Sequence, residues 1–476
     1  MVQSAPEMPE QSRESTTATP PSSRRTFLGQ AALAAAPAIR PAWGRQSPND
    51  TVRVGVVGFR GRGRDHYQIF AKMPGVRVAY LCDVDERLFA PAVAEVEELA
   101  GYRPETIVDF RKLIERRDLD AVSIATPDHW HALQTVWACQ AGKDVYVEKP
   151  VSYVLWEGRK MVEAARKYGR IVQAGLNRRS EPRVRSAIRF VREERFGPVY
   201  RAKAVVYRGR ASIGRAEESS IPEGVQWDLY LGPAPYRAFT PNRFHYGWHY
   251  FWDTSTTEVG NNGVHMIDLV RWGLGKQVHP VRIHCVGGRF ADDSDQETPN
   301  VQNASFEYAD GTLVELEVTT LPSPPFGGMH LGVVFYTPQG YVSSANNWST
   351  VSGRFLVNPE RNPLGGMALE VVARSFPKIS YEPGPPIPDL EPGPDDDGNH
   401  FANFIDCVRS RRREDLHCEI LEGHLSTALC HLANIAYRTA RKLVFDPEAE
   451  TFPGDEEANR LLRRTYREPY VMPEQV

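Results

Sequence analysis

From residue 52 to residue 174 the sequence repeats one pattern, in which a short apolar run is followed by an amphipathic helical stretch. The apolar runs occupy residues 53–57, 76–81, 121–125, 144–148 and 171–174. Strands that alternate with helices predict βαβ units and a parallel sheet with helices on both faces. We therefore expect an α/β fold with a doubly wound parallel sheet in a domain over residues 51–175. Ligands of such sheets bind at the carboxyl ends of the strands, so the residues after each run are site candidates.

The first apolar run leads directly into Gly58-Phe59-Arg60-Gly61-Arg62-Gly63. A strand, a glycine-rich turn and a helix form the phosphate-binding corner of dinucleotide folds, where free N–H groups meet the pyrophosphate. Arg60 stands where the usual G-x-G-x-x-G pattern has its second glycine. Either Gly61 takes over that role or Arg60 contributes its charge to the phosphate. Gly58, Arg60, Gly61 and Gly63 are the candidate phosphate-binding residues.

The second run ends at Asp83, close to the spacing at which an acidic residue binds the adenosine ribose hydroxyls. A carboxylate there repels a 2′-phosphate, so the pattern favours NAD over NADP; Asp85 is a second candidate. Four further residues at or near strand ends are predicted to contact the cofactor, namely Thr126, Pro127, His131 and Glu148. His131 stands at a helix start and could instead be a cap or a packing residue. Asp128 is expected to cap the helix that follows Pro127.

The run at 144–148 ends in Glu148-Lys149-Pro150. A lysine at the carboxyl end of a parallel strand faces bound substrate, and Pro150 stiffens the position because its ring fixes φ. A partly desolvated lysine can have a pKa near 7–8, which suits proton exchange with an alcohol or ketone. The alternative is a surface Glu-Lys pair that closes an ordinary strand.

From about residue 176 the pattern changes to longer alternating runs, at residues 199–207, 281–286, 304–308, 312–318 and 332–336. These runs predict an α+β domain over 176–397 with a large, open, mostly antiparallel sheet. Residues 345–397 are rich in Pro, Gly and Asp and are expected to form a loop excursion. Residues 398–476 are expected to form helices and a tail that pack back on the body.

Two segments of this second region carry candidate site residues. Residues 244–253 concentrate aromatic side chains that could stack on a sugar ring or simply fill the core, and they include Trp248, His249 and Trp252. In the second segment, His265 and Asp268 lie one helical turn apart, so Asp268 could orient His265 as a general acid or base. Further candidate substrate contacts are Arg178 and Asn261.

The first fifty residues resemble an export signal. Arg24-Arg25 precedes an Ala/Leu segment, as in twin-arginine signals, and Ala36-Pro37-Ala38 offers a cleavage site. The formal net charge of -3 gives no reason to expect a nucleic-acid partner, and no apolar run approaches the ~20 residues of a membrane span. The 6 cysteines follow no metal or disulfide spacing, so no metal site is predicted.

Taken together, these motifs resemble the Gfo/Idh/MocA family, named after glucose–fructose oxidoreductase and inositol dehydrogenase. The resemblance rests on five segments, namely the glycine turn, residues 82–85, residues 126–131, Glu148-Lys149-Pro150 and residues 263–268. It implies an NAD(P)-binding Rossmann domain, an open-sheet domain through which copies associate, and sugar or polyol substrates. By the same resemblance, Lys149 would be the catalytic lysine and His265 the catalytic histidine.

One position departs from the family. Its dehydrogenases often have Asp four residues before the histidine, whereas this chain has Asn261, which cannot exchange a proton at neutral pH. A relay would run through Lys149, His265 and His249, or the reaction is not a simple dehydrogenation.

The main hypothesis is an exported, NAD-dependent oxidoreductase of a sugar or sugar derivative with tightly bound cofactor. Outside the cytoplasm NAD cannot be exchanged, so a redox-neutral glycoside hydrolase or lyase is the alternative. In that reaction, transient oxidation at C3 permits elimination of the aglycone. A non-catalytic sugar- or NAD-binding protein is a third reading, favoured only by Arg60. The sugar, the carbon oxidised and the oligomeric state stay open.

Overall fold

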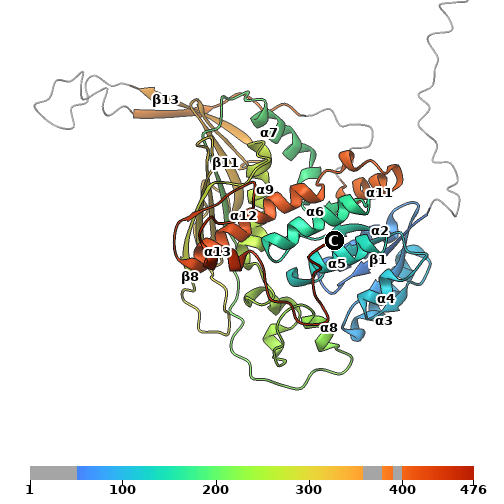
Figure 1. Ribbon diagram of the computed structural model, residues 1–476. Coiled ribbons are helices and arrows are strands. Elements are labelled where there is room, and N and C mark those ends of the chain that lie inside the picture. The colour runs from blue at the N-terminus through green and yellow to red at the C-terminus, as the bar shows by residue number, and fades with distance from the viewer. Residues whose placement is uncertain (1–50, 357–377, 390–398) are drawn as a thin grey trace, which may run out of the picture. The chain divides into compact units, whose positions relative to one another are not determined.

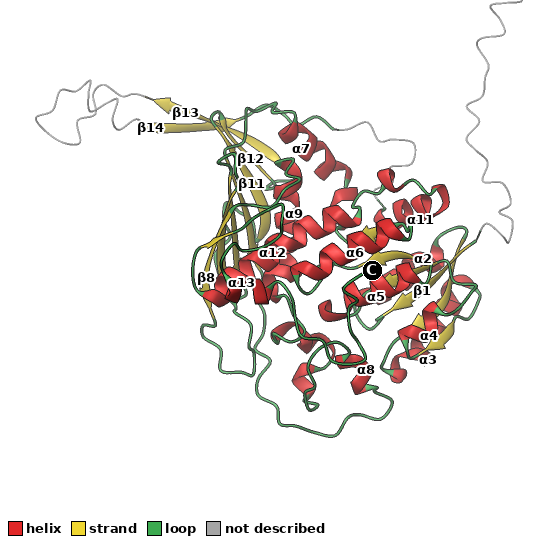
Figure 2. Ribbon diagram, in the orientation of Figure 1, coloured by secondary structure: helices red, strands yellow, loops and turns green. Residues whose placement is uncertain are grey.

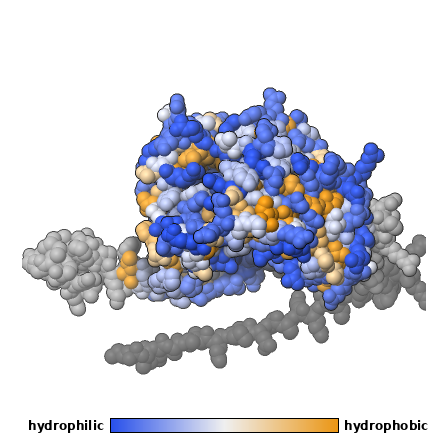
Figure 3. All heavy atoms as spheres, turned by 90° about the horizontal axis from the view of Figure 1, so that it is seen from below, coloured by the Kyte–Doolittle hydropathy of each residue, from blue (hydrophilic) through white to orange (hydrophobic). Residues whose placement is uncertain are grey.

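The computed structural model describes residues 51–356, 378–389 and 399–476 (Figure 1). The predicted export signal lies outside these residues. Seen from the side on which α8 (Trp227–Leu231) lies in Figure 1, the surface is mainly hydrophilic with smaller apolar patches (Figure 3). None of the described helices is long and apolar enough to cross a bilayer.

The N-terminal part is a six-stranded, fully parallel sheet in the order β3-β2-β1-β4-β5-β6. Its central strands are buried on both faces because helices flank them, as the apolar runs predict. The strands are β1 (Val52–Val57), β2 (Val76–Cys82), β3 (Glu105–Ile107), β4 (Ala121–Ile124), β5 (Asp144–Val147) and β6 (Val172–Ala174). The helices are α2 (Arg62–Lys72), α3 (Phe89–Ala100), α4 (Phe110–Ile114), α5 (Asp128–Gln140) and α6 (Leu155–Lys167).

The second part is a nine-stranded sheet in the order β14-β13-β12-β11-β7-β10-β9-β8-β15, in which only β7 and β10 pair in parallel. Its strands are β7 (Arg201–Tyr207), β8 (Arg282–Gly288), β9 (Val301–Glu307), β10 (Leu313–Thr319), β11 (Leu331–Thr337), β12 (Gly340–Ser343), β13 (Ser349–Leu356), β14 (Lys378–Pro383) and β15 (Leu443–Val444). Helices α9 (Val264–Gly273) and α12 (Ile420–Thr439) cover one face (Figure 2). Both predicted layers are therefore confirmed.

The expectation that residues 345–397 form only a loop excursion is wrong. β13 pairs with β12 and β14 pairs with β13, so two strands of this stretch extend the edge of the sheet. The sequence Ser349-Thr350-Val351-Ser352 is strand-like, but the many prolines and glycines further on dominated the prediction. Residues 357–377 and 390–398 lie outside the described part.

The C-terminal helices join the two sheets. α11 (His400–Ser410) packs on the first sheet, where Phe401 stacks on Tyr146 with ring centroids 4.5 Å apart. α12 contacts α6 on one side and α9 and β8 on the other. The remaining short elements are α7 (Pro182–Arg192), α13 (Glu456–Leu461), the 3-10 turns η2 (Glu86–Leu88), η3 (Asn177–Ser180), η4 (Pro241–Arg243), η5 (His245–Tyr250) and η7 (Arg413–Asp415), and the π-helical turn η6 (Val259–Gly263).

Candidate active site

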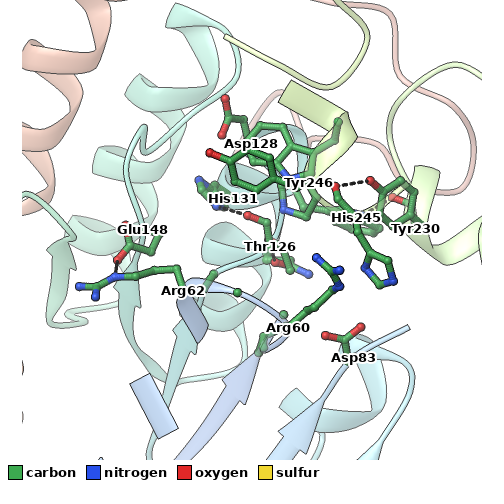
Figure 4. A pocket seen from close by; sticks show the side chains of 18 of the residues that line it. Arg60, Arg62, Asp83, Thr126, Asp128, His131, Glu148, Tyr230, His245 and Tyr246 are labelled. Carbon is green, nitrogen blue, oxygen red and sulfur yellow. Dashed lines mark hydrogen bonds and ion pairs between the residues drawn. The ribbon is translucent and has the colours of Figure 1, made fainter. Parts of the chain in front are cut away.

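A cavity of about 560 Å³ runs along the carboxyl ends of the parallel strands to the start of α9 (Figure 4). One end is formed by the glycine turn and the end of β2, and we call it the Asp83 end. The other end is formed by η5, η6 and the loop after β5, and we call it the Lys149 end. Each end takes residues from segments that are far apart in the sequence.

The glycine turn at the Asp83 end is built for close backbone approach. Gly58 has φ +76°, and a Cβ there would lie 2.8 Å from the Thr126 nitrogen. A Cβ on Gly63 would lie 2.2 Å from the Gly58 oxygen, so Gly63 packs the turn and does not line the cavity. Gly61 has open space around it and lines the cavity beside Arg60. These residues fit the pyrophosphate of a dinucleotide.

Asp83 closes the same end. Its carboxylate accepts hydrogen bonds from the N–H groups of Phe59 (3.0 Å) and Asp85 (3.1 Å), which tie it to the glycine turn. Burial raises the pKa of Asp83 to about 6. Figure 4 shows Arg60 beside Asp83 and His245. The alternative candidate Asp85 does not line the cavity, because it pairs with Arg87 (2.7 Å) and His245 (3.0 Å).

In the middle of the cavity, the side chain of His131 contacts the backbone of two segments. Its Nδ1 lies 2.6 Å from the Pro150 oxygen and its Nε2 lies 2.7 Å from the Thr126 oxygen, so the ring joins the ends of β4 and β5. Thr126 and Pro127 line the cavity as their places at the strand end suggest. The predicted capping role of Asp128 is wrong: Pro127 occupies the N-cap, and the Asp128 carboxylate accepts the Thr256 hydroxyl (2.6 Å).

Lys149 lies at the other end, directly after β5. Its Nζ donates to the backbone oxygen and to Oδ1 of Asn261, both at 2.9 Å. Burial lowers the pKa of Lys149, although the carboxylates of Glu148 and Asp128 oppose the effect. A lysine of this kind can give up its proton nearer neutral pH than a solvated one.

Glu148 lines the cavity but its carboxylate is already occupied. Oε1 accepts from Nε of Arg62 (3.0 Å) and from Nε2 of His66 (3.1 Å). Figure 4 shows the ion pair between Arg62 and Glu148. Burial opposes ionisation, but the hydrogen bond from His66 and the charge of Arg62 hold the pKa of Glu148 well below its usual range. This contact fixes the backbone on which Lys149 stands.

Besides His131, three histidines line the cavity, namely His245, His249 and His265, and these three are neutral near pH 7. Burial, with the charge of Lys149 in addition, lowers the pKa of His265 to about 3 and that of His249 well below its usual range. Burial and Arg60 lower the pKa of His245 to about 4. Nδ1 of His265 is buried and has no hydrogen-bond partner within the described residues. Lys149 is therefore the basic cavity group best placed to exchange a proton near neutral pH.

Three predicted substrate contacts are not brought to the cavity. Asp268 is 1% exposed and binds Arg179 (2.7 Å) and Ser426 (2.6 Å), so it does not orient His265. Trp252 stacks on Tyr437 with centroids 6.3 Å apart. Arg178 does not line the cavity, whereas its neighbour Asn177 does. Trp248, His249, Asn261 and His265 all line it.

Residues that the sequence analysis missed connect the Lys149 end. Glu258 accepts from Arg210 (3.1 Å), from Asn261 (3.2 Å) and from Asn262. Arg210 also donates to the Tyr246 hydroxyl (2.7 Å). The signal available in the sequence was a carboxylate three residues before Asn261, a spacing that places both side chains on one helical face.

The Asp83 end is closed by residues 224–231, which we call the clasp. Its backbone pairs with the segment after β2: the N–H of Gln226 donates to the Val84 oxygen (2.8 Å) and that of Glu86 to the Gly224 oxygen (2.9 Å). The C-terminal tail holds the clasp from outside, because Arg467 donates to the Asp228 oxygen (2.7 Å) and the Gly232 oxygen (2.9 Å). The clasp therefore bridges the second part of the chain to the cofactor groove.

One group of potential metal ligands occurs among the described residues, away from the cavity. Nε2 of His279 and of His424 lie 2.7 and 2.8 Å from Oε1 of Glu450, and Arg159 binds the same carboxylate. The carboxylate is thus neutralised by an arginine and saturated with donors, so we assign it no metal.

Comparison with known proteins identifies the class. The model of the Gfo/Idh/MocA family described as "Oxidoreductase family, NAD-binding Rossmann fold" matches residues 52–176. The model of the family's second domain, described as "Oxidoreductase family, C-terminal alpha/beta domain", matches residues 204–321 and 386–472. The chain belongs to the Gfo/Idh/MocA oxidoreductase family. NAD is its cofactor, and Asp83 at the ribose position agrees with that assignment.

Individual relatives are more distant. A "Glycosyl hydrolase family 109 protein" of Shewanella sp. (strain W3-18-1) is 32% identical over 120 residues, which is 24% of this chain and 26% of that protein. The WlbA dehydrogenase of Bordetella pertussis, solved with NADH and UDP-GlcNAcA, is 18% identical with a TM-score of 0.58 and covers 83% of this chain and 99% of that one. Aldose-aldose oxidoreductase from Caulobacter crescentus, solved with glycerol, is 18% identical with a TM-score of 0.56, covering 83% and 100%. These two structures share the fold.

Proposed function

We propose that this protein is an NAD-dependent oxidoreductase of a sugar, polyol or sugar derivative, and that its cofactor stays bound throughout the reaction. The observation that carries the proposal is the position of Lys149. Its Nζ faces the cavity that the glycine turn and Asp83 close at the other end. A hydroxyl-bearing substrate at the Lys149 end would thus lie beside the cofactor's reactive half.

Each residue at the Lys149 end has a chemical task in this proposal. Bound NAD would supply a hydride acceptor and donor. Lys149 in its neutral form takes the proton of the substrate hydroxyl and returns it in the reverse step. His249 and His265 hold neighbouring hydroxyls as neutral imidazoles, and the rings of Tyr246 and Trp248 cover the sugar face.

The clasp supports a retained cofactor. It covers the Asp83 end and is held by backbone hydrogen bonds and by Arg467, so the nucleotide would leave only after these contacts open. Retention also agrees with the proposed twin-arginine export, since an exported enzyme has no NAD pool to exchange with. The cofactor must then be restored by a second sugar or by the same substrate.

A redox-neutral glycoside hydrolase or lyase is the second candidate. Two observations favour it: the match to the glycosyl hydrolase family 109 protein, and Asn261 in place of the relay aspartate. In this reaction, oxidation at C3 makes the C2 proton acidic, and the aglycone is eliminated. Water and hydride are then added back, so the cofactor ends as it began.

The test starts with protein purified without added cofactor. After denaturation we expect about one NAD(H) per chain; no nucleotide would contradict retention. The intact protein is then mixed with single sugars, sugar pairs and aryl glycosides. Net oxidation of one sugar with reduction of another supports the oxidoreductase, and aglycone release without net NADH supports the hydrolase. Absence of both activities together with no nucleotide would favour a binding protein.

We also propose that copies of the chain associate through the open face of the nine-stranded sheet. The exposed side chains of Tyr200 (56%), Leu313 (46%) and Tyr381 (62%) belong to this sheet or its border. Light scattering on the purified protein tests the proposal, and a monomer at micromolar concentration would contradict it.

A further inference from the structure

The Lys149 end is organised around a carboxylate that does not itself line the cavity. The side chain of Glu258 is only 9% exposed, and that of its ion-pair partner Arg210 is 15% exposed. Nη2 of Arg210 lies 3.1 Å from Oε2 of Glu258. The carboxylate is therefore paired with a guanidinium and held in one place, directly behind the cavity wall formed by η6.

Two neighbouring asparagines donate to this carboxylate. Nδ2 of Asn261 lies 3.2 Å from Oε2 of Glu258, and Nδ2 of Asn262 donates to Oε1. An ionised carboxylate can only accept hydrogen bonds, so each amide must turn its NH₂ group toward Glu258. The amide oxygens consequently point the other way. Oδ1 of Asn261 accepts from Lys149 Nζ (2.9 Å), and Oδ1 of Asn262 accepts from Arg208 (3.3 Å).

A third arm runs through the arginine. Nη1 of Arg210 donates to the Tyr246 hydroxyl at 2.7 Å, so Glu258 also fixes that aromatic residue by way of Arg210. Lys149, Arg208 and Tyr246 all line the cavity. Each is linked to Glu258 through one intervening side chain. No other described carboxylate is joined to three cavity-lining residues in this way.

We propose that Glu258 is the positioning residue of this site: it orients Asn261 toward Lys149 and supplies, from one turn upstream, the negative charge that Asn261 lacks. The inference rests on the proposed role of Lys149 in proton transfer. Asn261 cannot relay a proton, so Glu258 acts by charge and orientation only. It favours the protonated lysine and keeps an acceptor in line with Nζ.

Other charges also face Lys149, and they set the background against which Glu258 acts. Glu148 and Asp128 favour the ammonium form, Arg62 disfavours it, and the nearby imidazoles of His249 and His265 are neutral near pH 7. Glu148 is engaged by Arg62 and His66, and Asp128 by Thr256. Glu258 differs from both because its contact with Lys149 passes through a single amide.

The experiment measures the protonation of Lys149 directly. Trace labelling with acetic anhydride across pH, read by peptide mass spectrometry, reports the neutral fraction of this one amine without any turnover. In Glu258→Gln the midpoint of the Lys149 labelling curve should move to lower pH by about one unit. The reason is the loss of a negative charge that acts on the ammonium through an effective dielectric of ~20. The double variant Glu258→Gln/Asn261→Asp should return the midpoint to the parental value or above it.

A matched control is Glu317→Gln. Glu317 also binds a cation and a tyrosine, Lys203 (2.6 Å) and Tyr207 (2.7 Å), but on the second sheet away from the cavity. This variant should leave the Lys149 midpoint unchanged. An unchanged midpoint in folded Glu258→Gln overturns the proposal.

If Glu258→Gln does not fold, Asn261→Ala tests the amide link alone, because it removes the acceptor between Lys149 and Glu258 and leaves the Glu258–Arg210 pair in place. Its midpoint must also fall, and an unchanged value overturns the proposal. The labelling is independent of catalysis. A parent protein that turns over no sugar would contradict the proposed function, whereas the effect of Glu258 on Lys149 would still be measured.

Discussion

Two arginine–carboxylate networks lie along the single helical segment formed by η6 and α9, and they differ in what they face. Near its start, Glu258 pairs with Arg210 behind the cavity wall and connects to Lys149 through Asn261. Further along, within α9, Asp268 pairs with Arg179, and their side chains are 2% and 4% exposed. The first network ends at a cavity and the second ends in the core.

The difference shows that the same kind of ion pair has different roles in the core and at the cavity wall. The Asp268 network joins η3, α9 and α12, since Ser426 donates to Asp268 and Glu422 binds Arg179. It fixes how these elements pack, and a buried charge of this kind is costly to leave unpaired. The Glu258 network lies at the cavity, so its loss should change chemistry more than folding.

The largest effect on chemistry is expected from Lys149→Met. Removing the proton-exchanging group should lower turnover roughly a hundred- to ten-thousand-fold, while the melting temperature stays near that of the parent. The measurement is steady-state activity on the substrate found by product analysis. The matched control is Lys143→Met at the other end of β5, whose Nζ caps the oxygens of Arg116 and Leu119, both at 2.8 Å. That variant should lose stability and keep its turnover per folded molecule.

The largest effect on stability is expected from Asp268→Asn. Breaking a buried ion pair leaves the Arg179 charge uncompensated and should cost about 3–5 kcal/mol in the free energy of unfolding. Denaturant titration measures it, with Glu258→Gln as the comparison that should lose less. Activity per folded molecule should be kept in Asp268→Asn. If activity fell while stability held, Asp268 would belong to the site after all.

These two carboxylates also show what the sequence could and could not predict. The parallel strands, the glycine turn, Asp83 and Lys149 could be located because strand patterns and the residues that end them are local in sequence. The role of Asp268 depends on Arg179, which lies 89 residues away, and that of Glu258 on Arg210, which lies 48 residues away. Such pairings come from tertiary packing. The spacing of His265 and Asp268 was read correctly as one helical turn, but the partner of Asp268 was not.

A smaller effect is expected where the tail holds the clasp. Arg467→Ala removes hydrogen bonds to the oxygens of Asp228 and Gly232, so the bound nucleotide should escape about tenfold faster. Dilution of the purified protein followed by assay of free nucleotide measures the escape rate. Arg463→Ala is the control in the same tail, because Arg463 pairs only with Glu474 among the described carboxylates. Equal rates in the two variants would mean that the tail does not retain the cofactor.

The smallest expected change concerns pH and separates His265 from Lys149. Burial lowers the pKa of His265 to about 3, so the imidazole is already neutral above that pH and stays neutral through the working range. His265→Asn should therefore reduce the rate about tenfold by removing a hydrogen bond to substrate, yet leave the midpoint of the pH–rate curve in place. In the proposed reaction that midpoint belongs to Lys149, whose pKa is lowered by burial, and the rate of oxidation should rise as pH passes through it because the neutral amine would be the base. In Glu258→Gln the same midpoint should move to lower pH. A midpoint that moved in His265→Asn by as much as in Glu258→Gln would show that the imidazole, rather than the lysine, titrates, and would place the proton exchange at the start of α9.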